Sequence, residues 1–217
     1  METIVDLFLN LDAHLAQLVV AYGRWIYAVL FAVIFAETGL VVTPLLPGDS
    51  LLFAAGAVAA TGALDIRIQL LLLVLAAVLG DAVNYAIGLR VGPLVFRGGG
   101  GGGVWARLLN RRHFERSHEF FERHGGKAIV LARFMPIVRT FVPFVAGVGE
   151  MSYPSFAFYN VAGALLWVGV CVGAGYAFGN VPIVKDNFSL VTIGIVLASV
   201  LPIAVEFLKH WRRRQAS

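Results

Sequence analysis

Five stretches of apolar residues, each close to the length that a helix needs to cross a bilayer, divide most of this chain. They cover residues 40–60, 68–89, 128–148, 155–178 and 188–208. Hydrophobic residues make up 59% of the sequence and charged residues only 14%, so a water-soluble fold would leave a large apolar surface exposed. The pattern therefore predicts an all-α, multi-pass membrane protein and excludes an ordinary soluble domain or a disordered chain.

The first 22 residues differ from these stretches because polar residues fill one side of the pattern. Apolar residues from Ile4 to Tyr22 recur at spacings of three and four, which predicts an amphipathic helix at 1–22 lying in the membrane interface. The alternative is that the apolar run 15–36 is the beginning of an ordinary span.

Two of the apolar stretches contain prolines and charged residues where hydrocarbon would surround them. The first contains Thr43, Pro44, Pro47, Gly48 and Asp49, and the second contains Arg133, Pro136, Arg139, Thr140 and Pro143. Proline removes a backbone donor and clashes with the preceding turn, so neither stretch is expected to form one continuous helix. Broken backbone at membrane depth persists only where protein or a wet cavity covers it. We therefore predict re-entrant hairpins at about 37–60 and 128–150.

Basic residues indicate how the chain is threaded through the membrane. They gather between 90 and 127 and again in the tail at 209–217, and the positive-inside rule places both segments in the cytoplasm. Three apolar stretches separate the two segments, so one of the three must enter and leave on the same side. The broken stretch at 128–150 is the obvious one, and this parity predicts that both termini and the 90–127 loop are cytoplasmic.

Short segments recur at equal separations along the chain. Phe53–Gly56 resembles Phe144–Gly147, and Tyr85–Gly88 resembles Tyr176–Gly179, which favours an internal duplication. One regular span must run inward and the other outward, so the two repeats are predicted to be inverted, as in secondary transporters.

This organisation predicts six divisions of the chain. They are an interfacial helix at 1–22, a first repeat at 23–92 with its span at 68–89, a glycine-rich and basic cytoplasmic segment at 93–127, a second repeat at 128–180 with its span at 155–179, a C-terminal span at 188–208 and a basic tail at 209–217.

Four ionisable residues, Glu37, Asp49, Arg133 and Arg139, lie in or beside the broken stretches. A charge at the bilayer centre costs about 2.5–3.5 kcal/mol, so these residues need partners or water and form the candidate substrate site. Paired arginines and the N-terminus of a half-helix both suit an anion. Two alternatives stay open: the charges only tie the hairpins together, or Asp49 is the N-cap of a half-helix. We expect the prolines, Gly48 and the two threonines of the broken stretches to support the hairpins.

Asp81 and Asn84 share one face of the 68–89 span, where they serve either structural hydrogen bonding or the transport pathway. His113, His118 and His124 do not share a helix face, so no metal site is expected. No nucleophile elbow, phosphate-binding loop or dinucleotide fingerprint is present in the sequence, which therefore predicts neither an enzyme nor a cofactor.

Segments 35–44, 46–53 and 133–141, with Gly125-Gly126-Lys127 before the last and Tyr159-Asn160 after it, resemble the DedA family of membrane proteins, also called the SNARE-associated or VTT-domain family. The resemblance covers nearly the whole chain and departs from the family at the glycine run 98–103. It implies a bacterial inner-membrane protein with paired re-entrant hairpins that flips lipids. The resemblance to bacterial members further implies transport of undecaprenyl phosphate and dependence on the proton motive force. It also implies that the acidic and arginine positions important in the family are Glu37, Asp49, Arg133 and Arg139 here.

These observations together predict a transporter of a phosphate-bearing lipid, either undecaprenyl phosphate or a phospholipid. The alternatives are a non-transporting membrane organiser and a proton-coupled exchanger of small ions. The expected partners are membrane lipids and not nucleic acid, with proton coupling through Glu37 or Asp49 as a hypothesis and homo-oligomer formation left open.

Overall fold

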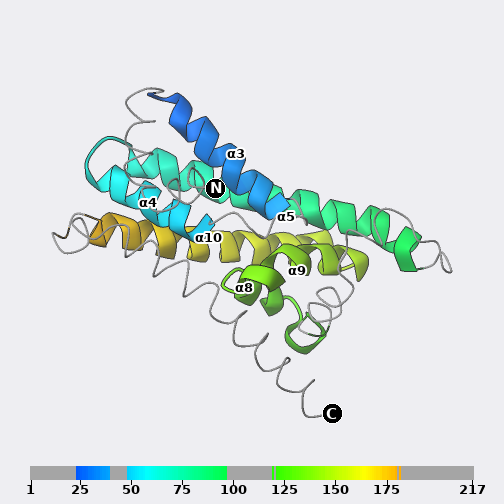
Figure 1. The fold of residues 1–217 in the computed structure, drawn as a ribbon. Coiled ribbons are helices and arrows are strands. Elements are labelled where there is room, and N and C mark those ends of the chain that lie inside the picture. Colours follow the sequence, from blue (N-terminus) through cyan, green and yellow to red (C-terminus); the bar gives the residue numbers. More distant parts are fainter. Residues whose placement is uncertain (1–22, 40–47, 97–118, 120, 180, 182–217) are drawn as a thin grey trace, which may run out of the picture.

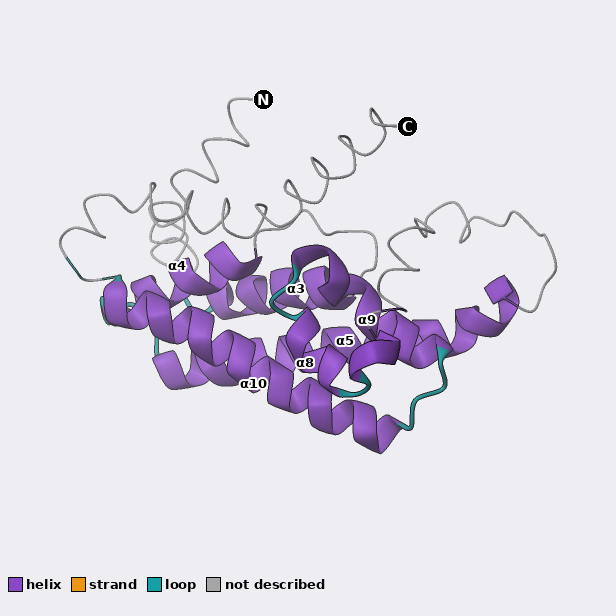
Figure 2. Cartoon of the chain, turned by 90° about the horizontal axis from the view of Figure 1, so that it is seen from below, coloured by secondary structure: helices purple, strands orange, loops and turns teal. Residues whose placement is uncertain are grey.

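The computed structural model describes residues 23–39, 48–96, 119, 121–179 and 181, and every regular element in this part of the chain is an α-helix (Figures 1 and 2). The helices are α3 (Trp25–Gly39), α4 (Gly48–Ala60), α5 (Ile66–Phe96), α8 (Lys127–Ala132), α9 (Pro136–Val148) and α10 (Tyr153–Phe178). The all-helical prediction is thus confirmed for the described residues. The predicted elements at 1–22 and 188–208, the tail and most of 93–127 lie outside them.

The two longest helices, α5 and α10, are long and apolar enough to cross a membrane. They run in opposite directions, because Phe156 near the start of α10 stacks on Tyr85 while Asn160 one turn later contacts the carbonyl of Val78. Large apolar side chains such as Leu71 and Leu165 are exposed along them, as expected of helices that face lipid. The predicted spans at 68–89 and 155–179 are therefore found as regular helices, with α5 extending further at both ends.

Helices α3 and α4 form a helical hairpin whose outer ends both lie near the start of α5. The hydroxyl of Tyr27 accepts a hydrogen bond from the backbone N–H of Asp65 at 2.8 Å, and Gly39 at the other end of α3 lies against Gly80. Helix α3 therefore runs parallel to α5, and α4 returns beside it. Helix α3, the first arm of this hairpin, begins at Trp25, whereas the sequence predicted a hairpin beginning at about residue 37. The difference arises because the apolar residues before Glu37 belong to the same helix.

Helices α8 and α9 form the second broken element, interrupted at residues 133–135. Met135 is extended, with φ −122° and ψ 101°, as expected of the residue before a proline, and Pro136 opens α9. The predicted break is therefore confirmed here, but it lies before Pro136 alone. Helix α9 continues through Pro143, whose missing N–H removes one helical hydrogen bond without ending the helix.

One arm of each broken element packs on the long helix of the other half of the chain. Helix α4 lies on α10, where a Cβ added to Gly56 would meet the carbonyl of Val172 at 2.2 Å. Helix α9 lies on α5, where a Cβ added to Gly147 would meet the carbonyl of Tyr85 at 2.2 Å. Gly56 and Gly147 hold equivalent places in the two similar segments noted in the sequence, so matching glycines allow close helix contact in both interfaces.

Candidate functional site

The two hairpins meet at a cluster of three charged side chains, which we call the tip cluster: Glu37 from α3, Asp49 from the first turn of α4, and Arg139 from the first turns of α9. Arg139 forms an ion pair with Glu37 through Nη2 and with Asp49 through Nη1, the latter at 3.1 Å. A single guanidinium thus holds two carboxylates that come from the two arms of the other hairpin. Helix α4 begins at Gly48, so Asp49 lies inside its first turn rather than ahead of it as an N-cap.

Gly48 is required by the geometry of the tip cluster. Its backbone N–H donates to Oε1 of Glu37 at 3.2 Å, which joins the end of α3 to the start of α4. A Cβ at this position would lie 1.9 Å from Oε2 of Glu37, so any other residue would displace the carboxylate. The predicted supporting role of Gly48 therefore has a physical basis, while Thr43, Pro44 and Pro47 lie outside the described residues.

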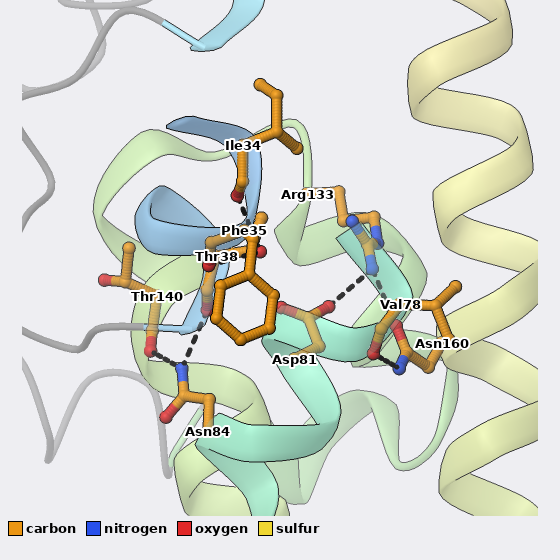
Figure 3. Close-up of polar contacts among 9 residues, drawn as sticks. All are labelled: Ile34, Phe35, Thr38, Val78, Asp81, Asn84, Arg133, Thr140 and Asn160. Carbon is orange, nitrogen blue, oxygen red and sulfur yellow. Dashed lines mark hydrogen bonds and ion pairs between the residues drawn. The ribbon is translucent and has the colours of Figure 1, made fainter. Parts of the chain in front are cut away.

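A second buried cluster, which we call the brace, consists of Arg133, Asp81 and Asn160 (Figure 3). Nη2 of Arg133 donates to Oδ2 of Asp81 and, at 2.6 Å, to Oδ1 of Asn160. The amide of Asn160 donates in turn to the carbonyl of Val78 at 3.0 Å. Residue exposure is 4% for Arg133, 4% for Asp81 and 1% for Asn160, so the brace fastens the broken segment to both long helices away from solvent.

Trp167 of α10 lies between the two clusters. Its indole Nε1 donates to Oδ1 of Asp49 at 2.8 Å. The guanidinium carbons of Arg139 and Arg133 lie 5.1 and 5.8 Å from the centre of its ring, within the range of cation–π attraction. Trp167 is 2% exposed, so a buried indole contacts charged groups of both clusters.

Asn84 connects the hairpins one turn further along α5 (Figure 3). Its side-chain amide donates to the carbonyl of Thr140 at 2.7 Å and to that of Thr38 at 3.3 Å. Thr38 packs against Gly80, and a Cβ added to Gly80 would lie 1.9 Å from the hydroxyl of Thr38. Asp81 and Asn84 therefore both make the structural contacts that the sequence left as one of two alternatives.

A small cavity lies between the clusters, lined by Thr38, Asp81, Arg133, Arg139, Thr140 and Trp167. Its volume of about 10 Å³ is room for one water molecule. Within the part of the chain that the structure describes, three buried polar atoms of these residues and their neighbours in sequence or contact have no hydrogen-bond partner: Nε of Arg133, which lines the cavity, Oε2 of Glu37 and Oδ1 of Asn84. Unpartnered buried atoms of this kind are places where water or a ligand group binds.

The structure brings together the four charged residues predicted from the sequence, but it divides them unevenly. Arg139 takes both Glu37 and Asp49, whereas Arg133 pairs with Asp81, which the sequence did not identify as a partner. The described site thus contains three carboxylates and two guanidinium groups, a formal charge of −1 rather than the zero expected from four residues. Asn160 and Trp167 were not predicted as site residues. Two signals pointed to Asn160: it is a polar residue within a regular span, and it belongs to a segment that resembles the family.

No group of three His, Cys, Asp or Glu side chains that could hold a metal ion occurs among the residues described. The donors of the site are guanidinium, indole and amide N–H groups, and they suit a negatively charged oxygen.

The VTT domain model matches residues 46–177 of this chain. The chain is 51% identical to Protein DedA of Escherichia coli (strain K12), over 96% of this chain and 94% of that protein. It is 44% identical to an uncharacterized membrane protein of Mycobacterium leprae (strain TN), over 78% of this chain and 74% of that protein. It is 36% identical to the inner membrane protein YghB of Escherichia coli (strain K12), over 89% and 82%. No solved structure matches the chain.

Proposed function

Because this chain belongs to the VTT-domain family of membrane proteins that includes DedA, we propose that it is a lipid transporter that moves a phosphate-bearing headgroup, of undecaprenyl phosphate or a phospholipid, across the membrane. The observation that carries the proposal is the tip cluster, in which charged groups from two broken helices meet beside two membrane-length helices. Arginine binds phosphate through two parallel N–H donors, so Arg139 suits the headgroup. The proposal assigns no covalent chemistry to the protein.

The proposed topology is a pair of inverted repeats, each with a re-entrant hairpin, in a bacterial inner membrane. The α3–α4 hairpin opens toward the start of α5, and the α8–α9 element packs along the part of α5 nearer its end. The equivalent glycine contacts of Gly56 and Gly147 support the duplication. The basic segment after α5 and the basic tail support their assignment to the cytoplasm.

The direction of α3 sets a condition on the N-terminus. If the end of α5 is cytoplasmic, α3, which runs parallel to α5, begins at the outer face. A cytoplasmic N-terminus then requires residues 1–22 to cross the membrane, whereas an interfacial segment there leaves the N-terminus outside. The two sequence predictions for this segment therefore exclude each other, and labelling of a cysteine introduced near residue 5, after replacement of Cys171, decides between them.

The charge balance of the site supports proton coupling. Three carboxylates already exceed two guanidinium groups, and a bound phosphate adds at least one more negative charge. Uncompensated charge away from water is unfavourable, so protonation of Glu37 or Asp49 restores the balance and releases Arg139 for the headgroup.

The brace favours a second candidate, a membrane organiser that transports nothing. Arg133, Asp81 and Asn160 are buried and hydrogen-bonded to one another, as in a purely architectural network. The same arrangement would hold two hairpins in fixed positions without any exchange of partners.

Reconstitution into liposomes tests the proposal. Purified protein is expected to move a fluorescent phosphate-bearing lipid between leaflets, faster than a neutral lipid with the same tails. Arg139→Ala should abolish this activity, while Arg123→Lys, at an exposed pair with Glu119, should retain it. Equal rates with and without protein would favour the organiser, and movement of small ions alone would favour an exchanger.

A further inference from the structure

Two hydrogen-bond donors converge on one oxygen of Asp49. Nη1 of Arg139 lies 3.1 Å from Oδ1, and Nε1 of Trp167 lies 2.8 Å from the same atom. The donors come from separate elements, α9 and α10, and the acceptor comes from α4. A negatively charged oxygen is therefore held at a point that the fold supplies with two N–H groups.

The three residues differ in how easily they can leave this point. The Asp49 side chain is 25% exposed, while the Arg139 side chain is 11% exposed and Trp167 is 2% exposed. Trp167 is fixed by its packing in the core formed by α3, α4, α5 and α10, and a buried indole N–H needs an acceptor at all times. The donors are thus the fixed part of the arrangement, and the carboxylate is the part that can be exchanged.

We propose that Trp167 Nε1 and Arg139 Nη1 form an oxyanion-binding pair, and that the carboxylate of Asp49 occupies it until an oxygen of a phosphate group replaces it. The inference rests on the proposed function and adds a binding residue, Trp167, to its site. When phosphate displaces Asp49, both donors stay paired, since the incoming oxygen accepts the two hydrogen bonds that Oδ1 of Asp49 gives up.

The chemistry of the two donors explains which ligands fit. The indole N–H and the guanidinium of Arg139 donate and cannot accept, so the pair takes an acceptor oxygen and not a cation. The charge of the guanidinium favours an anionic oxygen over the hydroxyl or ester oxygen of a neutral lipid. The positive end of α4, whose first turn contains Asp49, adds to the preference for negative charge. The pair therefore takes an anionic oxygen, and under the proposed function this oxygen belongs to a phosphate monoester or diester, as a lipid headgroup or as free phosphate.

Binding measured in detergent by calorimetry tests the assignment separately from transport. The probes are short-chain phosphatidic acid, inorganic phosphate and short-chain diacylglycerol as the neutral control. Trp167→Phe keeps an aromatic ring and removes only the N–H, and it should weaken phosphatidic acid binding about tenfold to a hundredfold, as expected for one hydrogen bond to a charged acceptor. Trp25→Phe, at a position that is 73% exposed, is the matched control and should bind as the wild type does.

The Asp49→Asn background separates direct binding from an effect through Asp49. Asp49→Asn removes the competing charge and should tighten phosphatidic acid binding, and adding Trp167→Phe should weaken it again. If Trp167 only positions Asp49, the second substitution has no effect in this background, and the assignment is wrong.

Intrinsic fluorescence gives a readout that needs no change at position 167. The triple variant Trp25→Phe, Trp105→Phe, Trp211→Phe retains Trp167 as its single tryptophan. Its emission should shift when phosphatidic acid binds and stay constant with diacylglycerol. A shift with inorganic phosphate as well would identify free phosphate as a second source of the ligand. Binding by the wild type without any shift overturns the role of Trp167 alone, and absence of binding by the wild type overturns the proposed function with it.

Discussion

The two buried arginines stand in opposite kinds of surroundings. Arg133 bonds to Asp81 and Asn160 of the two long helices, and the side chains of its ion pair are 4% and 6% exposed. Arg139 bonds to both arms of the facing hairpin, and one of its partners, Asp49, is 25% exposed. The difference supports the proposal that similar charges in one broken segment serve two purposes: Arg133 fastens the segment to the long helices, and Arg139 exchanges Asp49 for the headgroup.

The largest effect that would test this contrast is on stability. Asp81→Asn leaves Arg133 buried without its counter-charge and should lower the free energy of unfolding by about 3–5 kcal/mol. Asp49→Asn should lower it by less than about 1 kcal/mol, because Arg139 keeps Glu37 and the site is partly exposed. Denaturant unfolding in detergent provides the comparison.

The control for this measurement is the double variant with Asp81→Asn and Arg133→Gln. It removes both charges of the brace and should recover most of the lost stability. Equal losses for Asp81→Asn and Asp49→Asn would remove the distinction between the two clusters.

The next effect concerns transport by the lysine variants. Arg139→Lys replaces a two-pronged donor with a point charge and should slow lipid transport about tenfold to a hundredfold while the protein stays folded. Arg133→Lys should mainly lower thermal stability, and its transport per folded molecule should stay within about threefold of the wild type, as judged against a measured folded fraction. A larger transport defect for Arg133→Lys than for Arg139→Lys would reverse the assignment.

A smaller effect is expected at Gly48, the glycine that contacts the Glu37 carboxylate. Gly48→Ala places a methyl group against Oε2 of Glu37 and should destabilise the protein by about 1–3 kcal/mol, with a parallel loss of transport. Gly169→Ala is the matched control, because a Cβ there meets no atom within 4 Å and alanine favours the helix. Unchanged stability in both variants would mean that the hairpin tip is loosely packed.

The smallest effect is on the response to a pH gradient. Glu37→Gln and Asp49→Asn imitate the protonated carboxylates, so each should retain binding of a phosphate-bearing lipid and lose the acceleration that an imposed gradient gives the wild type. The liposome assay with and without a gradient measures this. A variant that loses lipid binding yet keeps its full gradient response would leave these carboxylates only the role of orienting Arg139.

Much of this architecture was predictable because proline and intramembrane charge act locally. The break before Pro136, the two regular spans and the candidate status of Glu37, Asp49, Arg133 and Arg139 follow from residue types at membrane depth.

The pairing of the charges was not predictable, because it depends on contacts between distant segments. Asp81 and Asn160 reach Arg133 only when α5 and α10 pack in opposite directions. The sequence of neither span indicates that Arg133 is the partner. Trp167 resembles any other apolar residue of α10 until the fold places Asp49 against its N–H.

The packing of α4 and α9 on the long helices of the opposite halves has a consequence for biosynthesis. Helix α4 packs on α10, the last helix of the described chain, so α4 leaves the ribosome well before its binding surface exists. During that interval its glycine face has no partner, and the nascent protein depends on the insertion machinery or on lipid to shield it. The two halves therefore complete their packing together, because α3 and α8 lie on the long helix of their own half while α4 and α9 need the long helix of the other.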